Sequence, residues 1–180
     1  MSATEIKFGG FGGQGVILAG IIVGRAASIY DNKFATLTQS FGPEARGSAC
    51  SAQVIVSQQK VLYPYVTRPE ILLVMSQEAC NKFLPETADD AVVILEEDLV
   101  KPKGLKPGMK VYGIPATRLA EELGRKMILN IVMVGFFTAV TKLVGYEAVR
   151  EAVKASVPPG TENMNLKAFE RGYEYGRTLA

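Results

Sequence analysis

The chain has 180 residues, of which 48% are hydrophobic, and a formal net charge of +2. This length suits one domain, over residues 1–180, with a core of ordinary size, and the balance of charge argues against general nucleic-acid binding. The chain contains no histidine, which excludes Ser-His and Cys-His nucleophilic pairs and removes the commonest metal ligand among side chains.

Cys50 and Cys80 are the two cysteines of the chain, and they form no CxxC or cluster spacing. Two thiolates are too few for a Cys₄ iron–sulfur cluster or for a structural zinc site on this chain alone. The segment Met1–Phe8 is too short and too polar for a secretory signal. We therefore expect reduced cysteines without a disulfide, and a cytoplasmic location.

Apolar runs bounded by turn residues predict the secondary structure. In the first half, in chain order, we predict a strand at Glu5–Phe8, a helix at Gln14–Tyr30, strands at Phe34–Thr38, Cys50–Ser57 and Glu70–Met75, and a short helix from the N-cap Ser76 to Phe83. In the second half we predict strands at Ala91–Glu96 and Lys110–Ile114, followed by helices at Thr117–Leu123, Met127–Val144, Tyr146–Ser156 and Asn163–Leu179. A hairpin between Cys50–Ser57 and Val61–Tyr63 is a further expectation.

Strands that alternate with helices, followed by helices alone, predict an α/β fold. We expect a single-domain layered sandwich with a mixed, mostly parallel sheet, a Rossmann-like first βαβ unit and a helical C-terminal part. The segment Met127–Val144 is the most hydrophobic stretch, but Asn130, Thr138 and Lys142 interrupt it. Since it is also at the short limit for a membrane span, we predict a buried helix and no membrane contact.

The stretch Lys7–Val16 holds five glycines within seven residues, between two apolar runs. Glycine at that density is tolerated where the backbone needs a positive φ or a close approach. We predict a strand, a tight glycine turn and a helix start, whose N–H groups suit a phosphate or a carboxylate. The candidate binding residues of this turn are Gly10, Gly12, Gly13, Gln14 and Gly15. The alternative is a turn that only lets helix and strand pack closely.

Gly10, Gly12 and Gly15 match the spacing of the dinucleotide-binding fingerprint. A site of that kind also needs an acidic residue at the end of the second strand, where this chain has Thr38 and Gln39. The turn is not a phosphate-binding P-loop either, because no Gly-Lys-Ser/Thr follows. The residues therefore do not favour NAD, NADP or FAD.

The loop 40–48 follows the second predicted strand and has turn chemistry throughout. Because the carboxyl ends of parallel strands share one edge of a sheet, this loop and the glycine turn should meet. Arg46 offers a charged fork for a phosphate or a carboxylate, and Glu44 could hold Arg46 or bind a ligand hydroxyl or amine. The alternative is a solvated loop with an internal Glu44–Arg46 pair. The candidate residues are Ser40, Gly42, Glu44, Arg46 and Gly47.

Catalytic groups are scarce in this chain. Glu96, Glu97 and Asp98 form an acidic run at a strand end, but without histidine they make a poor metal site, and we expect a solvated loop. A thiamine diphosphate site would show a Gly-Asp-Gly segment with a downstream Asn, which the chain lacks. We therefore predict no catalytic and no metal-binding residues here.

Five motifs resemble those of one family, the gamma subunits of 2-oxoacid:ferredoxin oxidoreductases. The motifs occur in order and span the whole chain. They are Gly10–Val16, Ser40–Gly47, Gly113–Ala116, Asn130–Gly135 and Asn165–Tyr173. Two departures are modest, with Phe41 where tyrosine is usual and Ser48 where a second glycine is common.

The resemblance implies one subunit of an assembly that decarboxylates a 2-oxoacid on thiamine diphosphate. In that family, electrons pass through iron–sulfur clusters to ferredoxin, and the products are CO₂ and an acyl-CoA. Thiamine diphosphate, Mg²⁺ and the clusters belong to the companion alpha, beta and, where present, ferredoxin-like delta subunits. The gamma subunit is associated with coenzyme A (CoA) binding and with subunit contacts.

The loop 40–48 looks most like the 2-oxoglutarate type, ahead of the pyruvate, ketoisovalerate and indolepyruvate types. The resemblance also implies that the chain is inactive alone, that it works in anaerobic metabolism, and that it could form a homodimer when isolated. It makes the glycine turn and the Arg46 loop sensible places for CoA phosphates, with Gln14 or Ser40 as polar supports. Two other functions stay open: a stand-alone nucleotide- or flavin-binding oxidoreductase, and an assembly subunit without a ligand.

Overall fold

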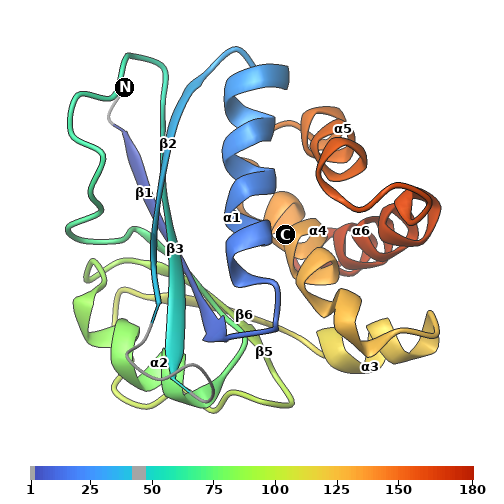
Figure 1. The fold of residues 1–180 in the computed structure, drawn as a ribbon. Helices are drawn as coiled ribbons and strands as arrows, with labels where there is room; N and C mark the ends of the chain where they lie inside the picture. Colours follow the sequence, from blue (N-terminus) through green and yellow to red (C-terminus); the bar gives the residue numbers. More distant parts are fainter. Residues whose placement is uncertain (1–2, 42–47) are drawn as a thin grey trace.

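A mixed sheet lies at the centre of the molecule (Figure 1). The computed structural model describes residues 3–41 and 48–180, and the strands in these residues are β1 (Thr4–Phe11), β2 (Phe34–Ser40), β3 (Ala49–Ser57), β4 (Ile71–Val74), β5 (Val92–Glu96) and β6 (Lys110–Ile114). Their order across the sheet is β2-β3-β1-β4-β5-β6. The pairs β1–β4, β4–β5 and β5–β6 are parallel, whereas β3 is antiparallel to both of its neighbours. The predicted mixed, mostly parallel sheet is confirmed.

Helices cover the two faces of the sheet unequally (Figure 1). The helices are α1 (Val16–Arg25) with its π-helical extension η1 (Ala26–Tyr30), α2 (Gln77–Phe83) with η2 (Leu84–Glu86), α3 (Ala116–Glu122), η3 (Lys126–Ile128), α4 (Leu129–Thr141), α5 (Tyr146–Ser156) and α6 (Glu162–Arg177). Successive side chains of β4 point to opposite faces of the sheet and so belong to different cores. Leu73 packs in the large core with α1, α4 and α6, whereas Leu72 and Val74 pack with Phe83 of α2 on the opposite face.

The local signals for two helix starts are confirmed. Ser76 is the N-cap of α2, and its hydroxyl accepts a hydrogen bond from the Ala79 N–H at 3.2 Å. This bond satisfies one of the free N–H groups that every helix start leaves. Pro115 immediately precedes α3, as its fixed φ favours.

The predicted hairpin between β3 and Val61–Tyr63 is wrong. Residues 58–70 form no strand, because β3 already has β2 on one edge and β1 on the other. The segment is held instead by the Glu5 carboxylate, which accepts hydrogen bonds from the N–H groups of Thr67 and Arg68 at 2.8 and 2.7 Å.

The two strands of the first βαβ unit, β1 and β2, are not neighbours in the sheet. β1, α1 and β2 follow one another as predicted, but β3 lies between β1 and β2 and is antiparallel to both. β1 and β2 therefore run in the same direction, and their carboxyl ends lie at one edge of the sheet. β2 is the outermost strand on that side.

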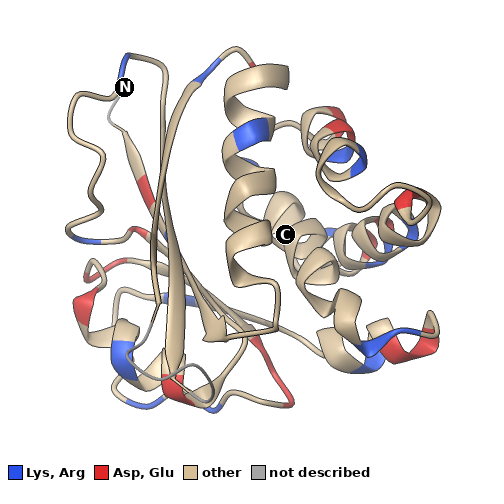
Figure 2. Ribbon diagram, in the orientation of Figure 1, with Lys and Arg blue, Asp and Glu red and all other residues tan. Residues whose placement is uncertain are grey.

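The helix α4 carries no charged residue and is tan along its whole length in Figure 2. It is buried between the sheet and α6, and glycines allow that close packing. A Cβ atom on Gly135 of α4 would lie 2.0 Å from the Phe169 carbonyl oxygen, and one on Gly172 of α6 would lie 1.9 Å from the Val132 carbonyl oxygen. The two backbones therefore touch at glycine.

The most hydrophobic stretch of the sequence becomes this interior helix, as predicted. Its residues from Leu129 to Ala139 are all buried. In the part of the chain that the structure describes, no helix is long and apolar enough to cross a membrane.

Candidate functional site

The glycine-rich stretch forms the predicted strand, turn and helix start. β1 ends at Phe11, α1 begins at Val16, and the Gln14 N–H donates to the Phe11 carbonyl oxygen at 3.1 Å. Gly13 and Gly15 have φ values of 92° and 72°. These left-handed conformations are the reason that glycine is needed at both positions.

The four glycines of the turn have different surroundings. A Cβ on Gly10 would lie 2.6 Å from the Gln14 Oε1 atom, and one on Gly15 would lie 2.2 Å from the Asn130 Nδ2 atom, so these two serve packing. Around Gly12 and Gly13, a Cβ would meet none of the described atoms within 4 Å. Gly12 and Gly13 are also exposed, and they form the part of the turn that a ligand can approach.

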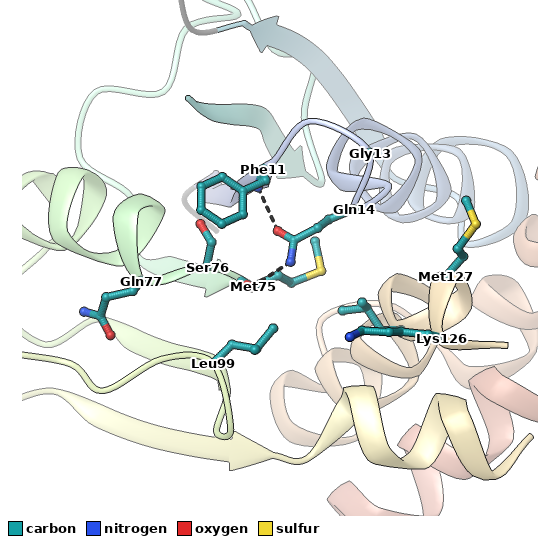
Figure 3. A pocket seen from close by; sticks show the side chains of 10 residues that line it. Phe11, Gly13, Gln14, Met75, Ser76, Gln77, Leu99, Lys126 and Met127 are labelled. Atoms are coloured by element: carbon teal, nitrogen blue, oxygen red, sulfur yellow. Dashed lines mark hydrogen bonds between the residues drawn. The ribbon is translucent and has the colours of Figure 1, made fainter. Parts of the chain in front are cut away.

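Gln14 braces the turn rather than facing outward. Its Oε1 accepts a hydrogen bond from the Phe11 N–H at 2.7 Å, and its Nε2 donates to the Met75 carbonyl oxygen at 2.9 Å. The side chain thus ties the end of β1 to the end of β4, as the dashed lines in Figure 3 show. Gln14 therefore positions the rim of the site.

A cavity of about 470 Å³ opens beside this brace (Figure 3). Its walls follow β1, β4 and β5 and include the start of α4, so it lies at the carboxyl ends of parallel strands. β1 continues into α1 on one face of the sheet, and β4 into α2 on the other. Such a switch point is where open α/β sheets bind ligands. Its lining includes the side chains of Phe11, Met75, Leu99, Lys126, Met127 and Leu129.

A second hollow, of about 300 Å³, lies on the other side of the turn. Gly12, Gly13, Phe41 and Cys50 are among its lining residues. The expected meeting of the glycine turn with the loop after β2 is therefore confirmed as far as Phe41.

The remaining candidates of that loop are less well placed or not described. Ser40 is the exposed last residue of β2 and pairs with Ser51 of β3. It does not line either hollow. Gly42, Glu44, Arg46 and Gly47 lie outside the described residues, so the Glu44–Arg46 pair stays a prediction.

Both cysteines are free and buried. Burial raises the pKa of the Cys50 thiol and of the Cys80 thiol. Both therefore stay protonated near neutral pH and are poor nucleophiles and poor metal ligands. In residues 3–41 and 48–180, no group of three or more Cys, Asp or Glu side chains could hold a metal ion.

In the acidic run Glu96–Asp98, the buried Glu96 differs from the expectation of a solvated loop. Glu97 and Asp98 are paired with Arg118, at 3.6 and 2.6 Å. Glu96, the last residue of β5, is fully buried, and burial raises the pKa of its carboxyl group. Its Oε1 accepts a hydrogen bond from the Thr117 N–H at 3.5 Å, whereas its Oε2 has no partner among the described residues.

Several residues of the site were not predicted from the sequence. Leu99, Lys126 and Met127 come from two segments far from the glycine turn, and no motif singles them out. Asn130 lies in a quoted motif, but its role was not predicted: its Nδ2 donates to the Gly15 carbonyl oxygen at 3.2 Å. This role of Asn130 could not be predicted from the sequence, because it depends on the contact between α4 and the glycine turn in the folded chain.

Comparisons with known proteins agree on one family. Residues 5–175 match the family described as pyruvate ferredoxin/flavodoxin oxidoreductase. The chain is 46% identical to the 2-oxoglutarate synthase subunit KorC of Methanocaldococcus jannaschii, over 97% of this chain and 95% of that protein.

Solved structures have the same fold. The gamma subunit of keto/oxoacid ferredoxin oxidoreductase from Geobacter sulfurreducens PCA matches with a TM-score of 0.90 and 37% identity, over 99% of this chain and 98% of that one. A 2-oxoglutarate:ferredoxin oxidoreductase from Magnetococcus marinus, with 2-oxoglutarate, coenzyme A and succinyl-CoA bound, matches with a TM-score of 0.88. At 19% identity and 32% of that chain, the second match concerns the fold alone.

Proposed function

The chain belongs to the pyruvate ferredoxin/flavodoxin oxidoreductase family as a gamma-type subunit of the 2-oxoacid enzymes, and we propose that its assembly acts on 2-oxoglutarate. The proposed reaction converts a 2-oxoacid and CoA into an acyl-CoA and CO₂ and passes the electrons to ferredoxin. The similarity to 2-oxoglutarate synthase subunits supports this substrate. The cytoplasmic location stays a prediction.

We propose that this subunit supplies a CoA-binding surface rather than redox groups. One observation carries this proposal: the open turn at Gly12 and Gly13 lies at the carboxyl edge of parallel strands, between two hollows. The N-terminus of a helix that follows such a turn suits a diphosphate. The Magnetococcus marinus enzyme, which shares the fold, has coenzyme A bound.

Thiamine diphosphate, Mg²⁺ and the iron–sulfur clusters are proposed to reside on the alpha, beta and delta subunits. The residues of this chain do not fit a cluster, because its two cysteines are buried and a cluster needs four thiolates. The gamma subunit is therefore expected to be inactive alone.

Exposed apolar side chains support a role in subunit contacts. β2 is an edge strand without charged residues, and Phe34 and Leu37 on it are exposed. Leu62 and Tyr63, in the irregular segment before β4, are exposed as well. An uncharged edge strand is a hazard for a protein that works alone, and a covering subunit would remove it.

The stand-alone nucleotide- or flavin-binding function gains no support from the end of β2. A Rossmann site needs a carboxylate there, and this strand ends with Thr38, Gln39 and Ser40.

The Arg46→Ala variant tests whether the loop after β2 takes part. A lost charged hydrogen bond is worth about 1.5–3 kcal/mol, so we expect the KM for CoA of the reconstituted assembly to rise about tenfold or more, with kcat at saturating CoA retained. Arg68→Ala is the matched control, because Arg68 lies at the opposite edge of the sheet and pairs with the exposed Asp89. An intact assembly with an unchanged KM would remove Arg46 from the site.

A further inference from the structure

The two edge strands of the sheet differ in how well they resist pairing with another strand. β6, at one edge, begins with Lys110 and contains Gly113, and both charge and glycine make a strand a poor template for pairing. β2, at the other edge, is seven residues long and carries no charged side chain. Such a strand offers free backbone N–H and C=O groups to a further strand.

The helical layer beside β2 is nearly free of charge as well. A groove of about 280 Å³ lies between α1 and β2, and Leu37 is among its lining residues. Arg25 is the one charged residue of α1, and its Nη1 atom donates to the Ala155 carbonyl oxygen at 2.8 Å. Asp31 and Lys33, which precede β2, pair with each other at 2.6 Å. This edge can therefore face a copy of itself without bringing unpaired like charges together (Figure 2).

The middle of β2 has a symmetric pattern of side chains. Leu37 lies on the α1 face, because a Cβ on Gly20 of α1 would lie 3.1 Å from its Cδ1 atom, yet 38% of Leu37 is exposed. Thr36 and Thr38, on either side of it, point to the opposite face. Their hydroxyl oxygens are buried and have no hydrogen-bond partner among the described residues, which is unfavourable. Two polar groups that lack a partner thus flank Leu37.

Building on the role in subunit contacts proposed above, we propose that β2 pairs antiparallel with β2 of a second copy of this chain, across a two-fold axis at Leu37. Leu37 then lies opposite Leu37 of the second copy, and Thr36 lies opposite Thr38 of that copy. A rotation about χ1 exchanges the hydroxyl and methyl positions of threonine. Each Thr36–Thr38 pair can therefore form the hydroxyl–hydroxyl bond that stabilises neighbouring strands.

Symmetry favours a second copy over a strand of another protein. A foreign strand would have to carry hydrogen-bonding groups at two set positions, whereas β2 supplies them by its own sequence. The axis stands perpendicular to the sheet, so the two α1 helices lie on the same face. There the groove lined by Leu37 and by Ile29, which is 63% exposed, faces the same groove of the second copy. The two glycine turns lie at opposite edges of the joined sheet.

The first test is the mass of the full chain by sedimentation equilibrium over a range of concentrations, where we expect a reversible dimer. Leu37→Lys removes two leucine contacts and places two ammonium groups opposite each other, so the dissociation constant of the dimer should rise at least about tenfold. Leu105→Lys is the matched control, because Leu105 is 42% exposed and lies in the loop between β5 and β6. It should leave the dimer intact.

The second test is of the register. Opposed residues of antiparallel strands have Cα atoms about 4.5–5.5 Å apart, within the range of a disulfide, so Leu37→Cys should give a disulfide-linked dimer on oxidation. In Gln39→Cys, on the same face of β2, the two new thiols would lie about 14 Å apart, and no cross-link is expected. The native cysteines are buried and do not interfere. Equal cross-linking of the two variants would contradict the register.

The outcomes separate this inference from the proposed role in subunit contacts. If the parent chain is monomeric at every concentration, or if Leu37→Lys dimerises as the parent does, this inference fails. If in that case Leu37→Lys, unlike Leu105→Lys, still prevents reconstitution of the assembly, a companion subunit covers β2 and the contact role stands. If Leu37→Lys changes neither self-association nor reconstitution, both fail at this edge.

Discussion

Glycines at two places in this molecule have opposite surroundings. Where α4 crosses α6, Gly135 and Gly172 leave no room for a side chain, because a Cβ would overlap the backbone of the other helix. In the turn after β1, Gly12 and Gly13 face open space. The first pair is needed to hold the helical layer together, whereas the second pair leaves a surface free. The motifs alone do not separate these roles.

The largest effect is expected at the helix crossing. Gly172→Ala places a Cβ 1.9 Å from the Val132 carbonyl oxygen, so α4 and α6 must move apart. Although alanine favours a helix over glycine by about 1 kcal/mol, we expect a net loss of about 3 kcal/mol or more in the free energy of unfolding. Urea denaturation followed by circular dichroism measures it, with Gly12→Ala as the control. Equal midpoints for the two variants would contradict the packing role.

A smaller effect is expected at Gly15, which belongs to the turn but behaves as a packing residue. Alanine there takes a left-handed conformation, which costs about 1–2 kcal/mol, and its Cβ approaches the Asn130 amide. We expect Gly15→Ala to destabilise the chain by about 2 kcal/mol or more. The double variant with Asn130→Ala should show a favourable coupling energy, since the clash is then absent. Simple additivity of the two losses would mean that the contact with Asn130 does not matter.

A pH-dependent effect is expected at Glu96, at the same edge of the sheet as the turn. Because burial raises its pKa, the folded state favours the protonated carboxyl. Its stabilising contribution is complete below the pKa of the unfolded chain, about 4.3, and is lost as the pH rises through the higher pKa of the folded state. Glu96→Gln should therefore gain stability relative to the parent chain between pH 5 and pH 8. A constant difference in urea midpoint across that range would show that Glu96 does not titrate as described.

Much of the fold could be predicted because its signals are local. The strand, glycine turn and α1 follow from glycines between two apolar runs, and the Ser76 cap is marked by its residue type. The partial meeting of the turn with Phe41 follows from a general rule about parallel strands. The insertion of β3 between β1 and β2 could not be predicted, because strand order depends on non-local pairing.

The site itself was only half predictable. Gly12 and Gly13 were identified with Gly10 and Gly15, but only the neighbouring Gln14, Val16 and Asn130 side chains show which glycines are free. The cavity depends on Leu99 and Lys126, whose positions result from the packing of separate segments. Glu96 was expected in solvent because three consecutive acidic residues after a strand usually form a solvated loop. The sequence does not show that the first of them is still part of the buried strand.

The most direct test of the central claim is a calorimetric titration of CoA into the chain and into its Gly12→Val variant. No described atom lies within 4 Å of a Cβ at Gly12, and its φ is not left-handed, so the variant should unfold at the urea concentration of the parent chain. We predict that the parent binds CoA and that the variant binds it at least about tenfold more weakly, because the valine side chain occupies the space above the turn. A variant that folds and binds CoA with the parent affinity would contradict the claim that the glycine turn is a ligand site.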